Sequence, residues 1–258
     1  MAKAALITGA SRGLGRAVAG ELARRGWTHL GLGCRTAVPS SQIAVPSDQL
    51  PGTGNGEPRA AVFPGDLADP AVPERLVREF LEFSGGRLDL LVNNAGVFQA
   101  RLAVELDEAE WDRQVAVNLS APFRMMRAAA AALAASRGAV VNVSSLVGMR
   151  GGHGASAYSA AKCGVEALTR TAAVEWGAAG VRVNAVIPGF LADTDMGRAS
   201  LPAYVRTVLA ASPLGRAADV GSAARLIADL AGLPAVTGQV LSLESRCGRA
   251  DAPPFDSD

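Results

Sequence analysis

The sequence has few of the residues that build metal centres or disulfide scaffolds. Its 258 residues include two histidines, His29 and His153, and three cysteines, with no C-x-x-C pair among them. We therefore expect neither a histidine-based metal site nor a Ser-His-Asp triad, and no disulfide framework. Free thiols fit a reducing compartment, so a cytoplasmic location is predicted.

Long apolar runs, internal repeats and a strong net charge are also missing. No apolar run approaches the ~20 residues that span a bilayer, and the N-terminal MAKAALITGA is too short for a secretion signal. A formal net charge of +1 gives no global attraction to nucleic acid or to an anionic membrane. We expect neither as a partner. With 49% hydrophobic residues, the chain can bury a large core.

Seven short apolar segments alternate with helical patterns along the chain. The expected strands are 4–8, 28–34, 60–63, 88–92, 139–144, 181–187 and 238–243, and the expected helices are 16–26, 73–83, 108–136, 157–177, 201–211 and 220–231. This alternation predicts an α/β fold with a doubly wound parallel sheet and helices on both faces. It forms one domain over residues 1–244, interrupted by a proline- and glycine-rich loop at 37–59 and followed by a flexible tail at 245–258.

The glycine-rich stretch TGASRGLG, residues 8–15, stands between an expected strand and an expected helix. A turn of this kind lets the backbone approach a pyrophosphate and directs the helix N-terminus at the phosphates. The order of strand, turn and helix therefore favours a dinucleotide site over a chance glycine turn.

Tyr158 and Lys162 lie four residues apart at the start of an alanine-rich helix, which places them on one face. A free phenol titrates near pH ~10, and a neighbouring ammonium group should lower that pKa. Ser145 ends an apolar strand and could hydrogen-bond the oxygen that the tyrosine protonates. These three residues predict a proton-transfer site for a carbonyl or alcohol. For an isolated Y-x-x-x-K pattern, surface residues on an ordinary helix would be the better interpretation.

Five motifs occur in a fixed order: TGASRGLG, NNAG at 93–96, the spacing from Ser145 to Tyr158, YSAAK at 158–162 and VNAVIPGF at 183–190. With them the chain resembles the short-chain dehydrogenase/reductase family, which implies a Rossmann-type sheet. GASRGLGRA, TDM at 194–196 and SPLGR at 212–216 are most similar to the 3-oxoacyl-[acyl-carrier-protein] reductases of that family.

The resemblance implies a catalytic tetrad. Tyr158 would be the general acid in reduction and the base in oxidation, and Lys162 would lower its pKa and bind the nicotinamide ribose. Ser145, rather than its neighbour Ser144, would hold the substrate oxygen. Asn118 would bend its helix and hold a proton-relaying water; without the family, a polar residue that satisfies a helix break would be the better interpretation.

The resemblance also implies a nicotinamide dinucleotide bound along the same edge. Its expected contacts are Gly9, Ser11, Arg12, Gly13, Leu14, Gly15, Arg35, Asp66, Leu67, Asn94, Ala95, Gly96, Tyr158, Lys162, Pro188, Gly189 and Thr194. Asp66 would accept from the adenine amine, and a turn or helix-capping aspartate is an equal alternative. Family members carry a threonine five residues after the proline, which is Asp193 here, so Thr194 fills that place only after a one-residue insertion.

Charge predicts which dinucleotide binds. The second strand ends in Cys34-Arg35-Thr36, without the acidic residue that would bind two ribose hydroxyls and repel a 2′-phosphate. Arg12 in the glycine turn and Arg35 could both pair with that phosphate. NADP(H) is therefore the expected cofactor, the alternative being that the arginines are solvated surface charges.

The favoured function is an NADPH-dependent ketone reductase acting on a 3-oxoacyl thioester of an acyl carrier protein, in fatty-acid or polyketide-type biosynthesis. Arg124, Arg127 and Arg137 are the candidate basic residues for the carrier near the site entrance. The alternative is an alcohol dehydrogenase or ketoreductase for a free sugar, steroid or xenobiotic; a non-catalytic cofactor sensor comes third. Family resemblance implies a homotetramer, with a homodimer next, packed through helices 108–136 and 157–177.

Overall fold

The computed structural model describes residues 2–35, 58–200, 202–244 and 246. Most of the predicted 37–59 loop and of the predicted 245–258 tail lies outside the described residues. Arg59, expected at the end of the loop, is instead the first residue of a strand, where it pairs with His29.

Seven parallel strands form one sheet in the order β3-β2-β1-β4-β5-β6-β7. Their bounds are β1 Ala4–Thr8, β2 His29–Cys34, β3 Arg59–Pro64, β4 Leu90–Asn93, β5 Ala139–Val143, β6 Arg182–Ile187 and β7 Val240–Ser242. The central strands β1, β4 and β5 are buried throughout, as their continuous apolar runs require when helices cover both faces. The predicted doubly wound parallel sheet is confirmed.

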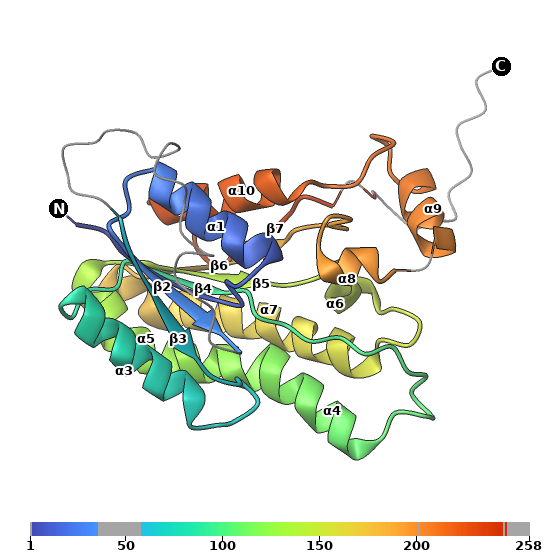
Figure 1. Cartoon of the computed structure of the whole chain (residues 1–258), viewed down its shortest axis with the longest axis horizontal. Coiled ribbons are helices and arrows are strands. Elements are labelled where there is room, and N and C mark those ends of the chain that lie inside the picture. The colour runs from blue at the N-terminus through green and yellow to red at the C-terminus, as the bar shows by residue number, and fades with distance from the viewer. Residues whose placement is uncertain (1, 36–57, 201, 245, 247–258) are drawn as a thin grey trace.

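Helices cover the sheet in two layers (Figure 1). On one face, α1 (Gly13–Arg24) and α10 (Val220–Gly232) pack together over a core that includes Leu22 and Ile227. On the other face lie α3 (Val72–Ser84), α5 (Ala121–Ser136) and α7 (Ser156–Trp176), over a core that includes Phe80 and Met125. The sheet thus separates two apolar cores.

The predicted long helical region 108–136 is not one continuous α-helix. It consists of α4 (Glu108–Val115), a π-helical turn η2 (Ala116–Ser120) and α5. Asp107 caps α4 by accepting the backbone N–H of Glu110 at 2.8 Å. Pro122 stands in the first turn of α5, where a missing N–H costs little. The π turn contains Asn118, at the place where the sequence predicts an interruption.

Three further short elements lie at the carboxyl end of the sheet: α6 (Leu146–Arg150), α8 (Asp195–Arg198) and α9 (Pro202–Ala210). A fourth, η3 (Gly177–Ala179), precedes β6 at the amino end. Of these, the sequence predicts only α9. The strand order reverses between β1 and β4, which is where open α/β sheets form their ligand crevice. Among the described residues, no helix combines the length and the apolar character needed to cross a membrane.

Candidate active site

The end of β1 is tied to the segment that follows β4. The hydroxyl of Thr8 accepts the backbone N–H groups of Asn94 and Ala95, each at 3.0 Å. The side-chain amide of Asn94 donates to the carbonyl oxygens of Thr8 at 2.9 Å and Gly9 at 3.2 Å. The glycine turn and the segment after β4 therefore form one wall of the crevice, as required if both contact the same ligand.

The start of α1 has free donors. Arg12 precedes the helix without capping it through its side chain, and the first turn contains no acidic residue. The first N–H groups and the positive end of the helix dipole are thus available to an anion. A Cβ on Gly15 would overlap the Gly9 carbonyl oxygen and lie 2.6 Å from the Asn94 amide nitrogen, so only glycine fits there. This close turn fits a dinucleotide pyrophosphate.

β2 ends beside the glycine turn. The backbone N–H of Ala10 donates to Gly33 O at 3.2 Å. Burial raises the pKa of the Cys34 thiol, partly offset by hydrogen bonds with Ser11 and the Ala10 backbone. Arg35 follows on the surface. Arg12 has Asp195 as its acidic neighbour and Arg35 has Asp66. The predicted contact of both arginines with one phosphate stays a prediction.

Tyr158, Lys162 and Glu166 follow one another at single-turn intervals along the inner face of α7. Lys162 is 3% exposed, and its Nζ donates to Val143 O at 2.8 Å while lying 5.5 Å from the centroid of the Tyr158 ring. A Cβ on Gly96 would come within 3.8 Å of that Nζ. The segment after β4 therefore reaches the lysine, and the two predicted site regions meet.

The pKa of Tyr158 differs from the sequence-based expectation. Burial raises it to about 12, against a smaller lowering by the hydrogen bond with Ser145, whereas the spacing to Lys162 predicted a value below the ordinary one. That prediction was wrong for the cofactor-free protein, because the lysine ammonium group lies over the ring and donates to a backbone carbonyl. Burial also lowers the pKa of Lys162, to about 8.

The two consecutive serines at the end of β5 have different partners. Ser145 hydrogen-bonds Tyr158, and it stands just before α6. Ser144 is buried, and its hydroxyl donates to Glu166 Oε1 at 2.7 Å. The structure therefore brings Ser145, and not Ser144, to the tyrosine, while Ser144 connects the end of β5 to the next turn of α7.

Asn118 is fully buried in the π turn. Its side-chain nitrogen donates to the carbonyl oxygens of Val97 and Gln114, both at 2.8 Å, and its side-chain oxygen accepts the Val97 N–H at 3.1 Å. A Cβ on Gly96 would lie 3.0 Å from that oxygen. Asn118 thus satisfies the helix break and also fixes the segment that lies against Lys162, while its predicted role in holding a proton-relaying water stays a prediction.

Asp66 follows β3 in a turn. Its carboxylate accepts the Ala68 backbone N–H at 3.0 Å and pairs with Arg113 at 3.3 Å. The Ala68 hydrogen bond, then Arg113 and Arg35, hold the pKa of this carboxyl group below its usual value. Leu67 beside it is buried. The aspartate has the contacts of a turn residue, and it lies at the same sheet edge as the glycine turn.

The segment after β6 covers the glycine turn. Gly189 has a left-handed φ of 77°, and a Cβ there would lie 3.1 Å from Ala218 Cβ. Thr194, rather than Asp193, faces the turn, because its methyl carbon lies 3.5 Å from where a Cβ of Gly13 would be. Thr194 also caps α8 by accepting the Gly197 N–H at 3.1 Å.

Several neighbours of the site were not predicted from the sequence. The Phe98 ring lies 5.2 Å from the Tyr158 ring, and Glu166 supports Ser144. Only Glu166 had a sequence signal, because its spacing continues the Tyr158 and Lys162 face. The C-terminal segment adds a buried ion pair between Glu244 and Arg246, with the Glu244 Cα 3.5 Å from the position of a Gly189 Cβ.

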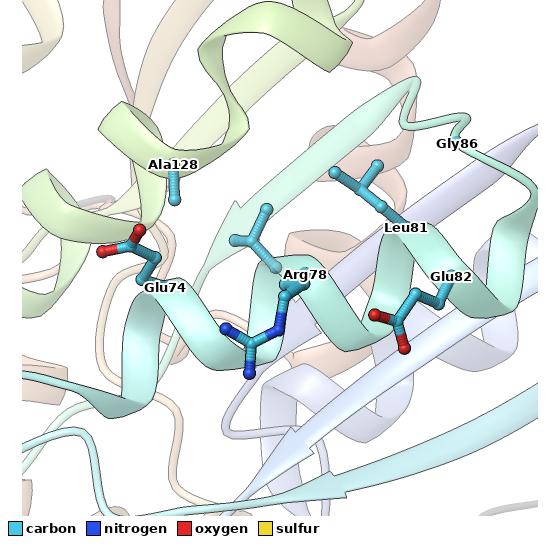
Figure 2. A pocket seen from close by; sticks show the side chains of 7 residues that line it. Glu74, Arg78, Leu81, Glu82, Gly86 and Ala128 are labelled. Atoms are coloured by element: carbon cyan, nitrogen blue, oxygen red, sulfur yellow. The ribbon is translucent and has the colours of Figure 1, made fainter.

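A surface groove lies elsewhere. It follows the exposed side of α3 toward α5, and Figure 2 shows Glu74, Arg78 and Glu82 along its length with Ala128 opposite. None of the predicted site residues lines it. Among the described residues, no group of three or more acidic, histidine or cysteine side chains could hold a metal ion.

The comparisons with known proteins agree with this geometry. The family model for short chain dehydrogenases matches residues 3–204. The 3-oxoacyl-[acyl-carrier-protein] reductase FabG of Escherichia coli K12 is 36% identical over 93% of this chain and 94% of its own. The (3R)-3-hydroxyacyl-CoA dehydrogenase of Mus musculus is 37% identical over 88% of each chain.

A solved structure shares the fold. A blue fluorescent protein from a metagenomic library, in complex with NADPH, superposes with a TM-score of 0.82 at 31% identity, covering 95% of this chain and 97% of that one. The chain belongs to the short-chain dehydrogenase family. It is an oxidoreductase that binds a nicotinamide cofactor and acts on hydroxyl or keto groups, and the predicted resemblance is confirmed.

Proposed function

We propose that this protein is an NADPH-dependent reductase of 3-oxoacyl thioesters. When bound, NADPH supplies the hydride that reduces the carbonyl carbon. Tyr158 donates its phenolic proton to the carbonyl oxygen, so the products are the 3-hydroxyacyl thioester and NADP⁺. The observation that carries the proposal is the position of the buried Lys162, with its Nζ 5.5 Å from the centroid of the Tyr158 ring and close to Gly96, at the edge where the glycine turn lies.

The raised pKa of Tyr158, about 12, suits the reductive direction. The phenol is protonated at neutral pH and remains a donor throughout the physiological range. Ser145 orients the oxygen that receives the proton. Lys162, held at Val143, would bind the nicotinamide ribose, and Asn118 keeps the segment at Gly96 in place beside it.

The binding of the cofactor is assigned to the crevice residues. The turn from Gly9 to Gly15 would hold the pyrophosphate through its free N–H groups. Arg12 and Arg35 would hold the 2′-phosphate, and Asp66 with Leu67 would lie at the adenine. Residues 94–96, 188–189 and Thr194 would surround the nicotinamide half.

The names of the relatives support a thioester substrate, since one is a 3-oxoacyl-carrier reductase and the other a 3-hydroxyacyl-CoA dehydrogenase. Support for a carrier protein is weaker. Arg137 was expected near the site entrance, but it follows α5 and packs on Gly180, at the amino end of the strands. Arg127 stacks on Phe123 at 5.6 Å. A free ketone substrate therefore stays as the second candidate.

Turnover assays separate these possibilities. The purified protein is given NADPH with acetoacetyl-CoA, an acetoacetyl carrier protein, or a panel of free ketones, and NADPH oxidation is followed by absorbance. The proposal expects the highest kcat/KM with one of the thioesters. A higher kcat/KM with a free ketone would move the assignment to the second candidate, and no turnover with any of them would favour a cofactor sensor.

We also propose that the enzyme is a cytoplasmic homotetramer or homodimer. On α5 and α7, Phe123 is 44% exposed and Val174 is 84% exposed, which is unusual for large apolar side chains on helices. Cys163 is exposed on the same helix as Val174. A second copy could cover these faces, and sedimentation velocity would give the number of subunits.

A further inference from the structure

One ion pair connects the cofactor turn to the segment after β6. Arg12 Nη1 lies 2.7 Å from Asp195 Oδ2, and the two side chains are 73% and 53% exposed. Arg198 Nη1 lies 3.6 Å from the other oxygen of the same carboxylate. Asp195 thus has two cationic neighbours, whereas Asp195 is the only acidic neighbour of Arg12 in the described part of the chain.

The backbone fixes this position of Asp195. Thr194 donates its hydroxyl to Leu191 O at 2.8 Å and accepts the Gly197 N–H at 3.1 Å, which holds the first turn of α8. The Thr194 methyl group rests over Gly13. The backbone of Asp195 is therefore held close to the glycine turn by contacts that do not depend on the ion pair itself.

A carboxylate and a phosphate compete for the same guanidinium donors. If Arg12 binds the 2′-phosphate of NADP(H), the phosphate competes with Asp195 for its N–H donors, and the two anions also repel each other. Asp195 then keeps Arg198 as its partner. NAD(H) has no 2′-phosphate, so it can bind while the pair between Arg12 and Asp195 stays intact.

We propose that Asp195 is a specificity-determining residue that weakens the binding of NADP(H) relative to NAD(H) by competing for Arg12. This proposal rests on the function proposed above only in the use of Arg12 for the 2′-phosphate. Exposed ion pairs are weak, so the competition should change the affinity about two- to fivefold. Asp195 adjusts the preference without creating it.

Binding calorimetry on the full-length protein tests this directly. Kd is measured for NADP⁺ and NAD⁺ with the wild type, with Asp195→Asn and with Asp193→Asn. The last variant removes the same charge two residues earlier, from an exposed aspartate that has no ion pair in the described structure. We expect Asp195→Asn to bind NADP⁺ about two- to fivefold more tightly, with the Kd for NAD⁺ unchanged and Asp193→Asn like the wild type.

Fragments of the cofactor and a double variant sharpen the test. Asp195→Asn should bind adenosine 2′,5′-bisphosphate more tightly than the wild type does, as expected for NADP⁺. The Kd for AMP should stay unchanged, as expected for NAD⁺. In an Arg12→Gln background, Asp195→Asn should no longer change either Kd, because neighbouring residues in one ion pair are not additive. High salt screens these charges, so it should reduce the gain in NADP⁺ affinity of Asp195→Asn.

The outcomes separate the two proposals. An equal gain in affinity for NADP⁺ and NAD⁺ in Asp195→Asn would mean that Asp195 repels the pyrophosphate of both cofactors. No gain for either would mean that the ion pair does not affect cofactor binding. Both results overturn the inference. A wild type that binds NAD⁺ more tightly than NADP⁺ contradicts the proposed cofactor instead. In that case, a gain confined to NADP⁺ in Asp195→Asn would still support the role of Asp195.

Discussion

The inner face of α7 and the outer rim of the glycine turn both belong to the crevice, but they are held in different ways. On the α7 side, Lys162, Glu166 and the neighbouring Ser144 at the end of β5 are each less than a tenth exposed, and all have hydrogen-bond partners in neighbouring strands or helices. At the rim, Arg12, Asp195 and Arg198 are at least half exposed. Water screens the charges at the rim, whereas on α7 each lost bond leaves a buried polar group.

The comparison teaches where to expect large effects. Proton transfer depends on buried groups whose positions and pKa values are set by packing, so single changes there should cost from about 1 kcal/mol to several kcal/mol. Cofactor discrimination depends on exposed charges and should change by small factors. The predictions below test the effects expected for the buried residues on and around α7.

The largest effect is expected for Tyr158→Phe. Loss of the proton donor should lower the reductive kcat by about 10²–10⁴-fold, while the Kd for NADPH stays within about twofold, because the ring still packs against Phe98. Steady-state kinetics and fluorescence titration measure both quantities. The other tyrosine of the chain provides the matched control: Tyr204→Phe, on α9, should keep kcat within about threefold. Equal losses in the two variants would contradict the role of Tyr158.

The next effect is the pH dependence that Lys162 gives to stability. Its pKa is about 8 in the folded protein, whereas an exposed lysine titrates near 10.5, so between these values the unfolded chain binds a proton that the folded chain lacks. Unfolding free energy therefore rises with pH across this window. Relative to Lys162→Met, the cofactor-free wild type should gain about 2–3 kcal/mol from pH 7 to pH 10, measured by urea unfolding.

Lys3, the only other lysine in the sequence, is the control for that measurement. It is exposed near the Trp27 ring, and an exposed ammonium group is hydrated in both the folded and the unfolded chain. Lys3→Met should show the same pH dependence as the wild type. If the free energies of unfolding of the wild type and Lys162→Met changed in parallel with pH, Lys162 would be solvated in the folded protein.

Much of this buried region could be predicted from the sequence, because its signals are local. The run from Ala4 to Thr8 ends at a glycine and forms β1 at the predicted residues. Asn118 and Pro122 predict an interruption of the alanine-rich helical region, and the structure has a π turn at Asn118. The spacing of Tyr158 and Lys162 places both on one face of α7.

The features that were missed depend on packing between distant segments. Helices α6 and α8 have five and four residues, too few for a periodic pattern. The raised pKa of Tyr158 follows from burial, which spacing does not reveal. The contact of Arg12 with Asp195 joins residues far apart in the sequence, and both look like ordinary surface charges until the fold places them together.

A smaller effect is expected at the π turn. Asn118→Leu keeps a similar volume, but it leaves the carbonyl oxygens of Val97 and Gln114 without their donor. We expect the free energy of unfolding to fall by about 2 kcal/mol, together with a lower kcat, because the segment at Gly96 loosens beside Lys162. Urea unfolding and steady-state kinetics measure the two losses. An unchanged stability would show that the backbone of the π turn needs no side chain to hold it.

The smallest effect should come from the pair of Ser144 and Glu166. Ser144→Ala removes the donor of a 2.7 Å bond and leaves a buried carboxylate oxygen unpaired. Its expected cost is about 1 kcal/mol of stability, with kcat within about threefold of the wild type, because Ser145 still contacts Tyr158. The double variant Ser144→Ala/Glu166→Gln should cost less than the sum of the single changes, since both remove the same bond. A strong loss of kcat in Ser144→Ala, without a loss of stability, would instead assign Ser144 to the reacting oxygen and break the distinction between the two serines.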